Sequence, residues 1–233
     1  MYTGEAYNVF LCFVISLTSL IVFFNLRKIR KNRKVEYSEG LDYFTLSLGL
    51  LWGIIGIRKI FNLFDRPDLN IFLFQWVSGP LNYIHLLPAF NYLGWNFFKE
   101  KKKIRLLFNG FFALMIFLTV LAFFKYEIIT GELGYWGSHH EANKAVGRLF
   151  IFTIFLPALI CILIEFVKWF RKWRQTGNPT DRQLLGFSIG FLIYAITGAI
   201  DTLGIFKGWA VLLVRVGMML APLTFYLSAA WED

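Results

Sequence analysis

The sequence predicts an all-α fold, a polytopic membrane protein built as a bundle of seven transmembrane helices. Of its 233 residues, 57% are hydrophobic and only 17% are charged. An ordinary soluble domain is about 45–50% apolar and about 25% charged. The apolar residues gather in long runs, and most Lys and Arg residues lie between these runs. A soluble domain of this composition would expose large apolar patches, which monomers rarely tolerate.

Seven runs are long enough for a membrane-spanning helix, which needs about 20 mostly apolar residues. No basic residue precedes the first run, and no clear small-residue cleavage site follows it, so we expect a retained helix rather than a signal peptide. We expect a single membrane domain over residues 1–233, without a soluble output domain. The predicted spans are roughly residues 6–26, 42–64, 71–98, 104–125, 147–170, 183–206 and 208–231.

The basic residues between the spans predict the orientation. Loops with more Lys and Arg stay in the cytoplasm, and this rule predicts an outside N-terminus and a cytoplasmic C-terminus in a prokaryotic cytoplasmic membrane. The net charge of +9 is therefore a topology signal that also favours contact with anionic membrane lipids, and no nucleic-acid partner is expected. One set of loops carries sixteen basic residues, Arg27, Lys28, Arg30, Lys31, Arg33, Lys34, Lys99, Lys101, Lys102, Lys103, Arg105, Lys168, Arg171, Lys172, Arg174 and Arg182; the other carries seven, Arg58, Lys59, Arg66, Lys125, Lys144, Arg148 and Lys207.

The third span carries a polar stripe. Its members recur at spacings of three and four residues, which places them on one helix face. Pro80 and Pro88 interrupt the same span and free backbone carbonyls. Such a stripe either makes hydrogen bonds between helices or lines a path for a ligand or a proton. The stripe consists of Gln75, Ser78, Asn82, His85, Ala89, Tyr92 and Asn96.

The sixth and seventh spans carry opposite charges. Asp201 and Arg215 lie at similar distances on either side of the turn at Lys207, so an antiparallel hairpin brings them to a comparable depth. Two such charges are expected to pair rather than remain alone in the membrane. Arg58 and Lys59, near the outer end of the second span, can join them. The group is either a structural ion pair or an outward-facing polar pocket for a small ligand.

Other ionisable residues favour structural roles. Glu165 lies beside Lys168 and Arg171 near the cytoplasmic end of the fifth span, as expected for a paired carboxylate. His139 and His140 are weak candidates for a metal site, because adjacent histidines do not share one helix face. No second histidine lies within the spans besides His85, which excludes a bis-His haem within one chain. We therefore expect no cofactor and no metal.

Small residues form two further stripes, which permit close approach of helix backbones. They also leave room for a homo-oligomer or a partner helix. The stripes are Gly49, Gly53 and Gly56 in the second span and Gly186, Gly190 and Gly198 in the sixth.

The sequence lacks the residues that several classes of functional protein require. The last span has Arg215 and no lysine for a retinal Schiff base, and the chain contains no HExxH, no GxSxG and no P-loop motif. No nucleophile, base and orienting residue fall together, so we do not expect an enzyme.

Three motifs resemble a known family. Trp76, Pro80, Leu87-Pro88 and Asn91-Tyr92 lie in the third span, residues 181–186 (DRQLLG) lead into the sixth, and residues 198–201 (GAID) precede its outer turn. This order is similar to the seven-helix membrane sensor regions of bacterial and archaeal histidine kinases and diguanylate cyclases. The resemblance implies a sensor of extracellular or membrane-dissolved small molecules. Because no kinase or cyclase follows here, signalling would pass to a separate membrane or cytoplasmic protein.

These observations together predict a receptor-like membrane protein with an outward-facing polar pocket. Ligand binding would alter the packing of the last two helices. Two alternatives remain open, an accessory subunit of a larger membrane complex and a transporter of ions or small molecules. The predicted ligand-binding residues are Trp76, Asn82, His85, Asp201, Arg215 and Arg58.

Overall fold

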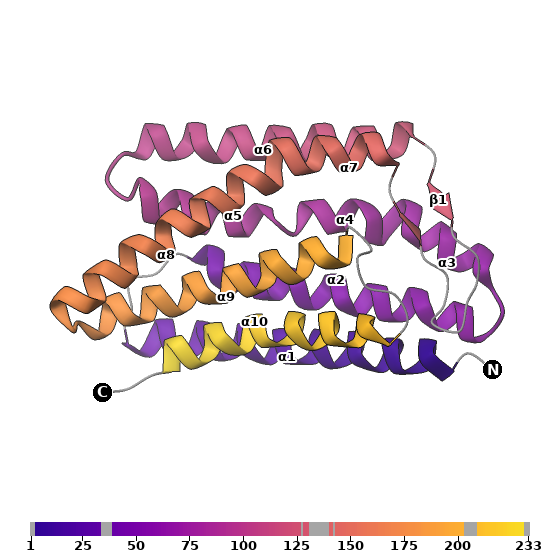
Figure 1. Ribbon diagram of the computed structural model, residues 1–233, viewed down its shortest axis with the longest axis horizontal. Helices are drawn as coiled ribbons and strands as arrows, with labels where there is room; N and C mark the ends of the chain where they lie inside the picture. The colour runs from indigo at the N-terminus through magenta and orange to yellow at the C-terminus, as the bar shows by residue number, and fades with distance from the viewer. Residues whose placement is uncertain are drawn as a thin grey trace.

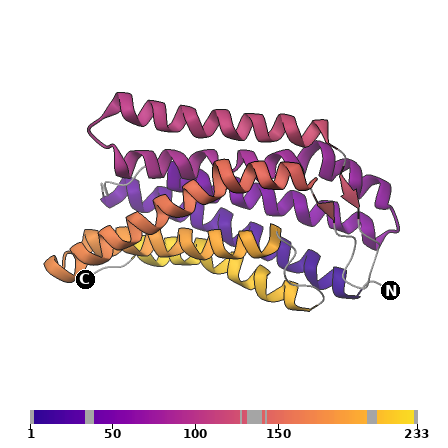
Figure 2. The ribbon, with the colours of Figure 1, turned by 45° about the horizontal axis from the view of Figure 1, so that its top comes forward.

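Long helices that run side by side make up nearly all of the chain. Figure 1 shows them in a computed structural model, which describes residues 3–33, 39–126, 128–130, 140–141, 143–202 and 209–230. Helices α1, α2, α9 and α10 form one side of the bundle, α5, α6 and α7 form the other, and α8 crosses obliquely between them (Figures 1 and 2). The all-α prediction is confirmed.

Six helices of the described chain are long and apolar enough to cross a membrane, which indicates a multi-pass membrane protein. The fourth of them in chain order is continuous through a π-helical turn, η2. Their elements are α1 (Thr3–Arg33), α2 (Glu39–Leu63), α6 (Lys102–Lys125), α7 (Lys144–Phe150) with η2 (Ile151–Phe155) and α8 (Leu156–Thr176), α9 (Pro179–Thr202) and α10 (Ala210–Ala230).

The segment predicted as the third span is not one continuous helix. It consists of α3 (Pro67–Leu73), the π-helical turn η1 (Phe74–Ser78), α4 (Gly79–Ile84) and α5 (Leu87–Phe97). Pro80 lies where α4 continues from η1, and Pro88 lies in the first turn of α5. The division into pieces agrees with the interruption that these prolines predict, and the pieces follow one another along the bundle (Figure 1).

The turn between α8 and α9 is defined by local backbone chemistry. Gly177 ends α8 in the left-handed conformation, with φ of +64°, which glycine adopts without steric cost. Asn178 then accepts a hydrogen bond from the Thr180 amide at 2.8 Å, so Asn178 caps α9 and the helix begins at Pro179, before the predicted residue 183.

Near the other end of the bundle, β1 (Ile129–Thr130) pairs antiparallel with β2 (His140–Glu141).

Close helix pairs form where the glycine stripes predicted them. Ser16 of α1 donates a hydrogen bond to the Gly49 carbonyl of α2 at 2.7 Å. A Cβ atom added at Gly49 would lie 3.1 Å from the Ser16 carbonyl oxygen, so these two backbones are in direct contact. Gly186 and Gly190 of α9 likewise face α10, against Ser228 and Phe225.

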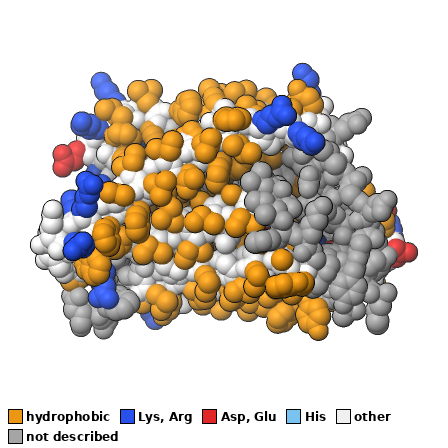
Figure 3. All heavy atoms as spheres, in the orientation of Figure 1, with side chains coloured by type: hydrophobic (Ala, Val, Ile, Leu, Met, Phe, Trp, Pro, Cys, Tyr) orange, Lys and Arg blue, Asp and Glu red, His pale blue; other side chains and the backbone are white. Residues whose placement is uncertain are grey.

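The surface matches a membrane environment. Figure 3 shows apolar side chains across the middle of the visible face and Lys and Arg side chains toward its ends. Helix α6 is one example, and its outward side chains are large and apolar. They include Leu106, Leu107, Phe111, Leu114, Phe117, Leu118 and Leu121.

Candidate functional site

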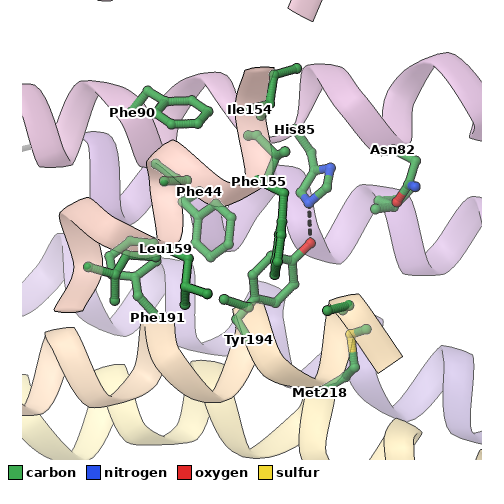
Figure 4. Close-up of a pocket in the computed structure, with 18 of the residues that line it drawn as sticks. Phe44, Asn82, His85, Phe90, Ile154, Phe155, Leu159, Phe191, Tyr194 and Met218 are labelled. Carbon is green, nitrogen blue, oxygen red and sulfur yellow. Dashed lines mark hydrogen bonds between the residues drawn. The ribbon is translucent and has the colours of Figure 1, made fainter. Parts of the chain in front are cut away.

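A cavity of about 110 Å³ lies between α2, the α4–α5 segment, η2 and α8, α9, and α10. We call it the central cavity (Figure 4). Most of its lining is aromatic or aliphatic, with a small polar part. The apolar lining includes Phe44, Leu51, Trp52, Ile55, Leu86, Phe90, Leu93, Phe150, Ile154, Phe155, Leu159, Ile162, Phe191 and Met218, and the polar lining is Asn82, His85, Tyr194 and Asp201.

His85 lies at the break between α4 and α5. The Ser47 hydroxyl of α2 donates to the Phe44 carbonyl of its own helix at 2.9 Å and also lies 3.2 Å from the His85 carbonyl oxygen. The His85 ring Nδ1 lies 3.2 Å from the Leu81 carbonyl oxygen, and because a carbonyl only accepts, Nδ1 is the donor. In the neutral ring Nε2 then accepts from the Tyr194 hydroxyl of α9, with which it is in contact (Figure 4).

Aromatic rings hold this pair in place. Phe44, which is fully buried on α2, stacks on His85 with ring centroids 6.1 Å apart and meets Tyr194 edge-on at 5.1 Å. Phe191, one turn earlier on α9, lies 5.2 Å from Phe44. The His85–Tyr194 hydrogen bond therefore belongs to a rigid aromatic wall of the central cavity.

Another wall comes from the π-helical turn η2. Its residues Ile154 and Phe155 both line the cavity, and Pro157 follows in the first turn of α8. A π-helical turn inserts one residue into the helix and reorients the side chains after it, and such turns recur at functional sites. The opposite wall, where His85 interrupts the third segment, is irregular as well.

The end of the cavity that contains Asp201 is charged. Arg215 of α10 lies with its Nη1 2.7 Å from Asp201 Oδ2, donates from Nε to Asn8 Oδ1 at 3.2 Å, and lies over the Trp52 ring at 4.6 Å. The Arg215 side chain is 8% exposed and that of Asp201 is 29% exposed. The predicted ion pair is thus present, and it connects the cavity wall to α1.

A polar cluster continues from this pair toward the start of α1. Glu5 is fully buried and lies 3.3 Å from Lys59 Nζ, and it accepts hydrogen bonds from Asn62 at 2.8 Å and Asn8 at 3.3 Å. The sequence interpretation missed Glu5, because it treated the residues before the first apolar run as a polar flank. Its position four residues before Val9, on the face that buries Cys12 and Ile15, was the available signal.

The structure brings together most of the predicted site residues, but not all. Asn82, His85 and Asp201 line the central cavity, Arg215 pairs with Asp201, and Arg58 lies on α2 just beyond the cavity residue Ile55. Trp76 is not brought together with them, because it lies outside the cavity lining, is 56% exposed and packs against Phe124 of α6 with ring centroids 5.4 Å apart.

Two further residues of the predicted stripe contact other helices, whereas Ala89 lines the cavity. Asn96 of α5 donates to Glu165 of α8 at 3.4 Å, and Tyr92 lies 5.1 Å from Phe191 of α9. Glu165 is fully buried and pairs with Lys168 at 3.4 Å, as predicted, and it also accepts a hydrogen bond from Trp169. The interpretation of the stripe as hydrogen bonds between helices is confirmed at Asn96, whereas Tyr92 contributes a ring contact.

The weak metal candidates receive no structural test. His139 lies outside the described residues, and only the backbone of His140 is described, in β2. Among the residues whose side chains the structure describes, no group of three or more His, Cys, Asp or Glu is placed to hold a metal ion.

Comparison with known proteins places the chain in no family. No family model, no curated protein and no solved structure matches it significantly. The resemblance to sensor regions of kinases and cyclases therefore stays a prediction, and the functional argument depends on the central cavity and the polar cluster.

Proposed function

We propose that this protein is a receptor-like seven-helix membrane protein that binds a small, mostly apolar molecule in its central cavity. The seventh crossing is the broken segment from α3 to α5, which follows the length of the bundle (Figure 1). An outside N-terminus, a cytoplasmic C-terminus and a prokaryotic cytoplasmic membrane are supported by the basic residues in the three inner loops. The polar cluster then faces outward.

The observation that carries this proposal is the composition of the cavity wall. Ligand sites are mostly apolar, with a few polar groups that fix orientation, and here the His85–Tyr194 pair lies among aromatic and aliphatic residues. Asn82 lines the cavity and is also exposed, so the cavity reaches the surface beside α4. A ligand with one carbonyl or hydroxyl group would satisfy the polar pair while the aromatic rings cover its apolar part.

Binding would couple the cavity to the last two helices. Tyr194 and Asp201 of α9 and Met218 of α10 all contribute to the lining. A ligand that competes for the Tyr194 hydroxyl would change the hydrogen bond between α9 and the α4–α5 break, and it would thereby favour one packing of α9 over another. A separate membrane or cytoplasmic protein would then detect the change.

Thermal unfolding of the detergent-purified chain tests the proposal. Probes are small compounds with one polar group, of a size that suits a cavity of about 110 Å³, namely phenol, benzyl alcohol and cyclohexanol. Ala195 lines the cavity, so Ala195→Leu fills it, whereas Ala113→Leu on the exposed face of α6 is the matched control. We expect at least one probe to raise the Tm of the wild type and of Ala113→Leu but not that of Ala195→Leu. Equal responses in all three, or no response to any probe, would contradict ligand binding in the cavity.

A transporter is the second candidate, and the broken third segment favours it. Discontinuous helices with freed carbonyls form substrate sites in many transporters, and His85 lies at such a break. Counterflow of a stabilising probe in proteoliposomes, abolished by His85→Leu, would support transport over sensing. A partner that copurifies in fixed stoichiometry from the native membrane would instead favour an accessory subunit.

A further inference from the structure

Arg58, which directly precedes Lys59 of the polar cluster in α2, has no anionic partner among the described residues. Arg58 of α2 is only 8% exposed, and its Nε and Nη1 atoms make no hydrogen bond. Its guanidinium lies over the Phe74 ring of η1 at 4.7 Å. A ring face attracts a cation, but it neither accepts the N–H bonds in the guanidinium plane nor neutralises the charge.

The neighbouring carboxylates are already engaged. Glu5 pairs with Lys59 and accepts from Asn62 and Asn8, and Asp201 pairs with Arg215. Among the described residues the cluster therefore holds three cations, Arg58, Lys59 and Arg215, against two carboxylates. A buried charge without a counterion is strongly unfavourable, and water bound to its N–H groups would not neutralise it.

We propose that Arg58 is the anchor of a second binding site, which takes an anionic phosphate or carboxylate group. A guanidinium recognises these groups by charge-assisted hydrogen bonds, and here the unmatched donors lie in a low-dielectric environment, where such bonds are strong. Arg58 is not part of the lining of the central cavity. The anion site is therefore separate from the proposed apolar ligand site and does not depend on it.

Two sources supply this chemistry, a free anion and a lipid headgroup, and one experiment separates them. The delipidated chain is unfolded thermally in an uncharged detergent, with inorganic phosphate titrated against sodium chloride at constant ionic strength. In a parallel arm, the chain is reconstituted in nanodiscs of phosphatidylglycerol or of phosphatidylcholine. Stabilisation by phosphate identifies a free-anion site, and stabilisation by phosphatidylglycerol alone identifies a lipid site.

The variants test the role of Arg58 itself. We expect a rise in the wild-type Tm of about 5 °C or more when the anion is about 100-fold above its dissociation constant. Arg58→Met should lose this rise and should melt at an equal or higher temperature than the wild type without anion, because it removes an unpaired charge. Arg66→Gln is the matched control, since Arg66 lies at the same end of α2 but is exposed and paired with Asp68 at 2.8 Å, and it should respond as the wild type does.

Two outcomes would overturn the proposal. One is a wild type that responds to neither phosphate nor phosphatidylglycerol, and the other is an Arg58→Met variant that responds as strongly as the wild type. If Arg58→Met does not fold, Arg58→Lys decides, because it keeps the charge but loses the planar donor set. Arg58→Lys should require at least about tenfold more anion than the wild type for the same rise in Tm. An unchanged midpoint of the anion titration would refute the site.

Discussion

His85 and Tyr194, 109 residues apart in the chain, are joined by a hydrogen bond in the wall of the central cavity. The bond connects two different kinds of backbone. His85 ends α4 at an irregular break, whereas Tyr194 lies within the regular helix α9. The hydrogen bond therefore joins the interrupted third segment directly to α9, which also carries Asp201.

We expect Tyr194→Phe to destabilise the protein without disturbing its packing. The variant keeps the ring, which packs on Phe44, but leaves the buried His85 Nε2 without a donor, at a cost of about 1–3 kcal/mol. Chemical unfolding in mixed micelles, followed by tryptophan fluorescence, measures this change. Because the two side chains interact directly, the double variant should lose less free energy of unfolding than the sum of the losses in Tyr194→Phe and His85→Leu. Strict additivity, or an equal loss in the exposed control Tyr7→Phe, would speak against the bond.

The sequence predicts this site only in part, for a physical reason. Asp201 and Arg215 are near neighbours along an antiparallel hairpin, so counting residues from the turn is enough to pair them. His85 and Tyr194 lie on helices that are distant in the chain, and their contact depends on how each helix is rotated about its axis. Many bundle arrangements satisfy the same apolar periodicity, and only the packed structure selects the rotation.

The position of Trp76 has a more local explanation. Trp76 is not a member of the predicted stripe, and it lies within η1. One residue inserted by a π-helical turn rotates the preceding face by about 100° relative to the following one. Ser78 at the end of η1 and His85 beyond it are buried, whereas Trp76 in the middle of η1 is exposed. The prolines indicated an interruption, but nothing in the sequence distinguished a kink from a π-helical turn.

A comparison of two glycines tests the close contact between α1 and α2. In Gly49→Ala the new methyl group would lie 2.9 Å from Leu20 Cγ and 3.1 Å from the Ser16 carbonyl oxygen, and such overpacking costs about 1–3 kcal/mol. Gly110 on α6 has no atom within 4 Å of the corresponding position, so Gly110→Ala should be neutral or gain about 0.5–1 kcal/mol from its higher helix propensity. Unfolding curves of both variants against the wild type provide the measurement. A similar gain in both would mean that the two substitutions act through helix propensity alone and that Gly49 makes no close contact that matters for stability.

The Asp201–Arg215 pair should respond asymmetrically to mutation. Asp201→Asn leaves the deeply buried Arg215 cation without its carboxylate, and because Asp201 is partly exposed we expect the lower end of the about 3–5 kcal/mol lost when a buried pair is broken. Arg215→Gln leaves a carboxylate that water can reach, so it should cost less than Asp201→Asn. The double variant should be more stable than the sum of the two predicts. Unfolding free energies of all three decide this, with Asp68→Asn in the exposed Arg66 pair as a control that changes stability by at most about 1 kcal/mol.

The same variants separate a structural pair from a functional one. If Asp201→Asn and Arg215→Gln lower the Tm but keep the response to the cavity probe, the pair serves the fold alone. A lost response at an unchanged Tm would instead place the pair in ligand binding.

The membrane topology depends on whether the broken segment from α3 to α5 crosses the bilayer. If it does, residues before and after it lie on opposite sides, and if it does not, they lie on the same side. Arg66 precedes the segment and Lys101 follows it, while Gln175 lies near the end of α8, and all three are exposed. Single-cysteine variants at these positions, in a background with Cys12 and Cys161 replaced, therefore report the topology by labelling.

We expect a membrane-impermeant maleimide to label Arg66→Cys in intact cells, and to label Lys101→Cys and Gln175→Cys only after the cells are broken. This pattern follows from seven crossings with an outside N-terminus, since the loops with most Lys and Arg remain in the cytoplasm. Labelling of Arg66→Cys and Lys101→Cys from the same side would show that the prolines at 80 and 88 turn the segment back rather than carry it across. In that case Lys101 and Gln175 would still share a side, because α6 and the α7–α8 helix lie between them. The comparison of Arg66 with Lys101 therefore isolates the one crossing that helix length alone does not establish.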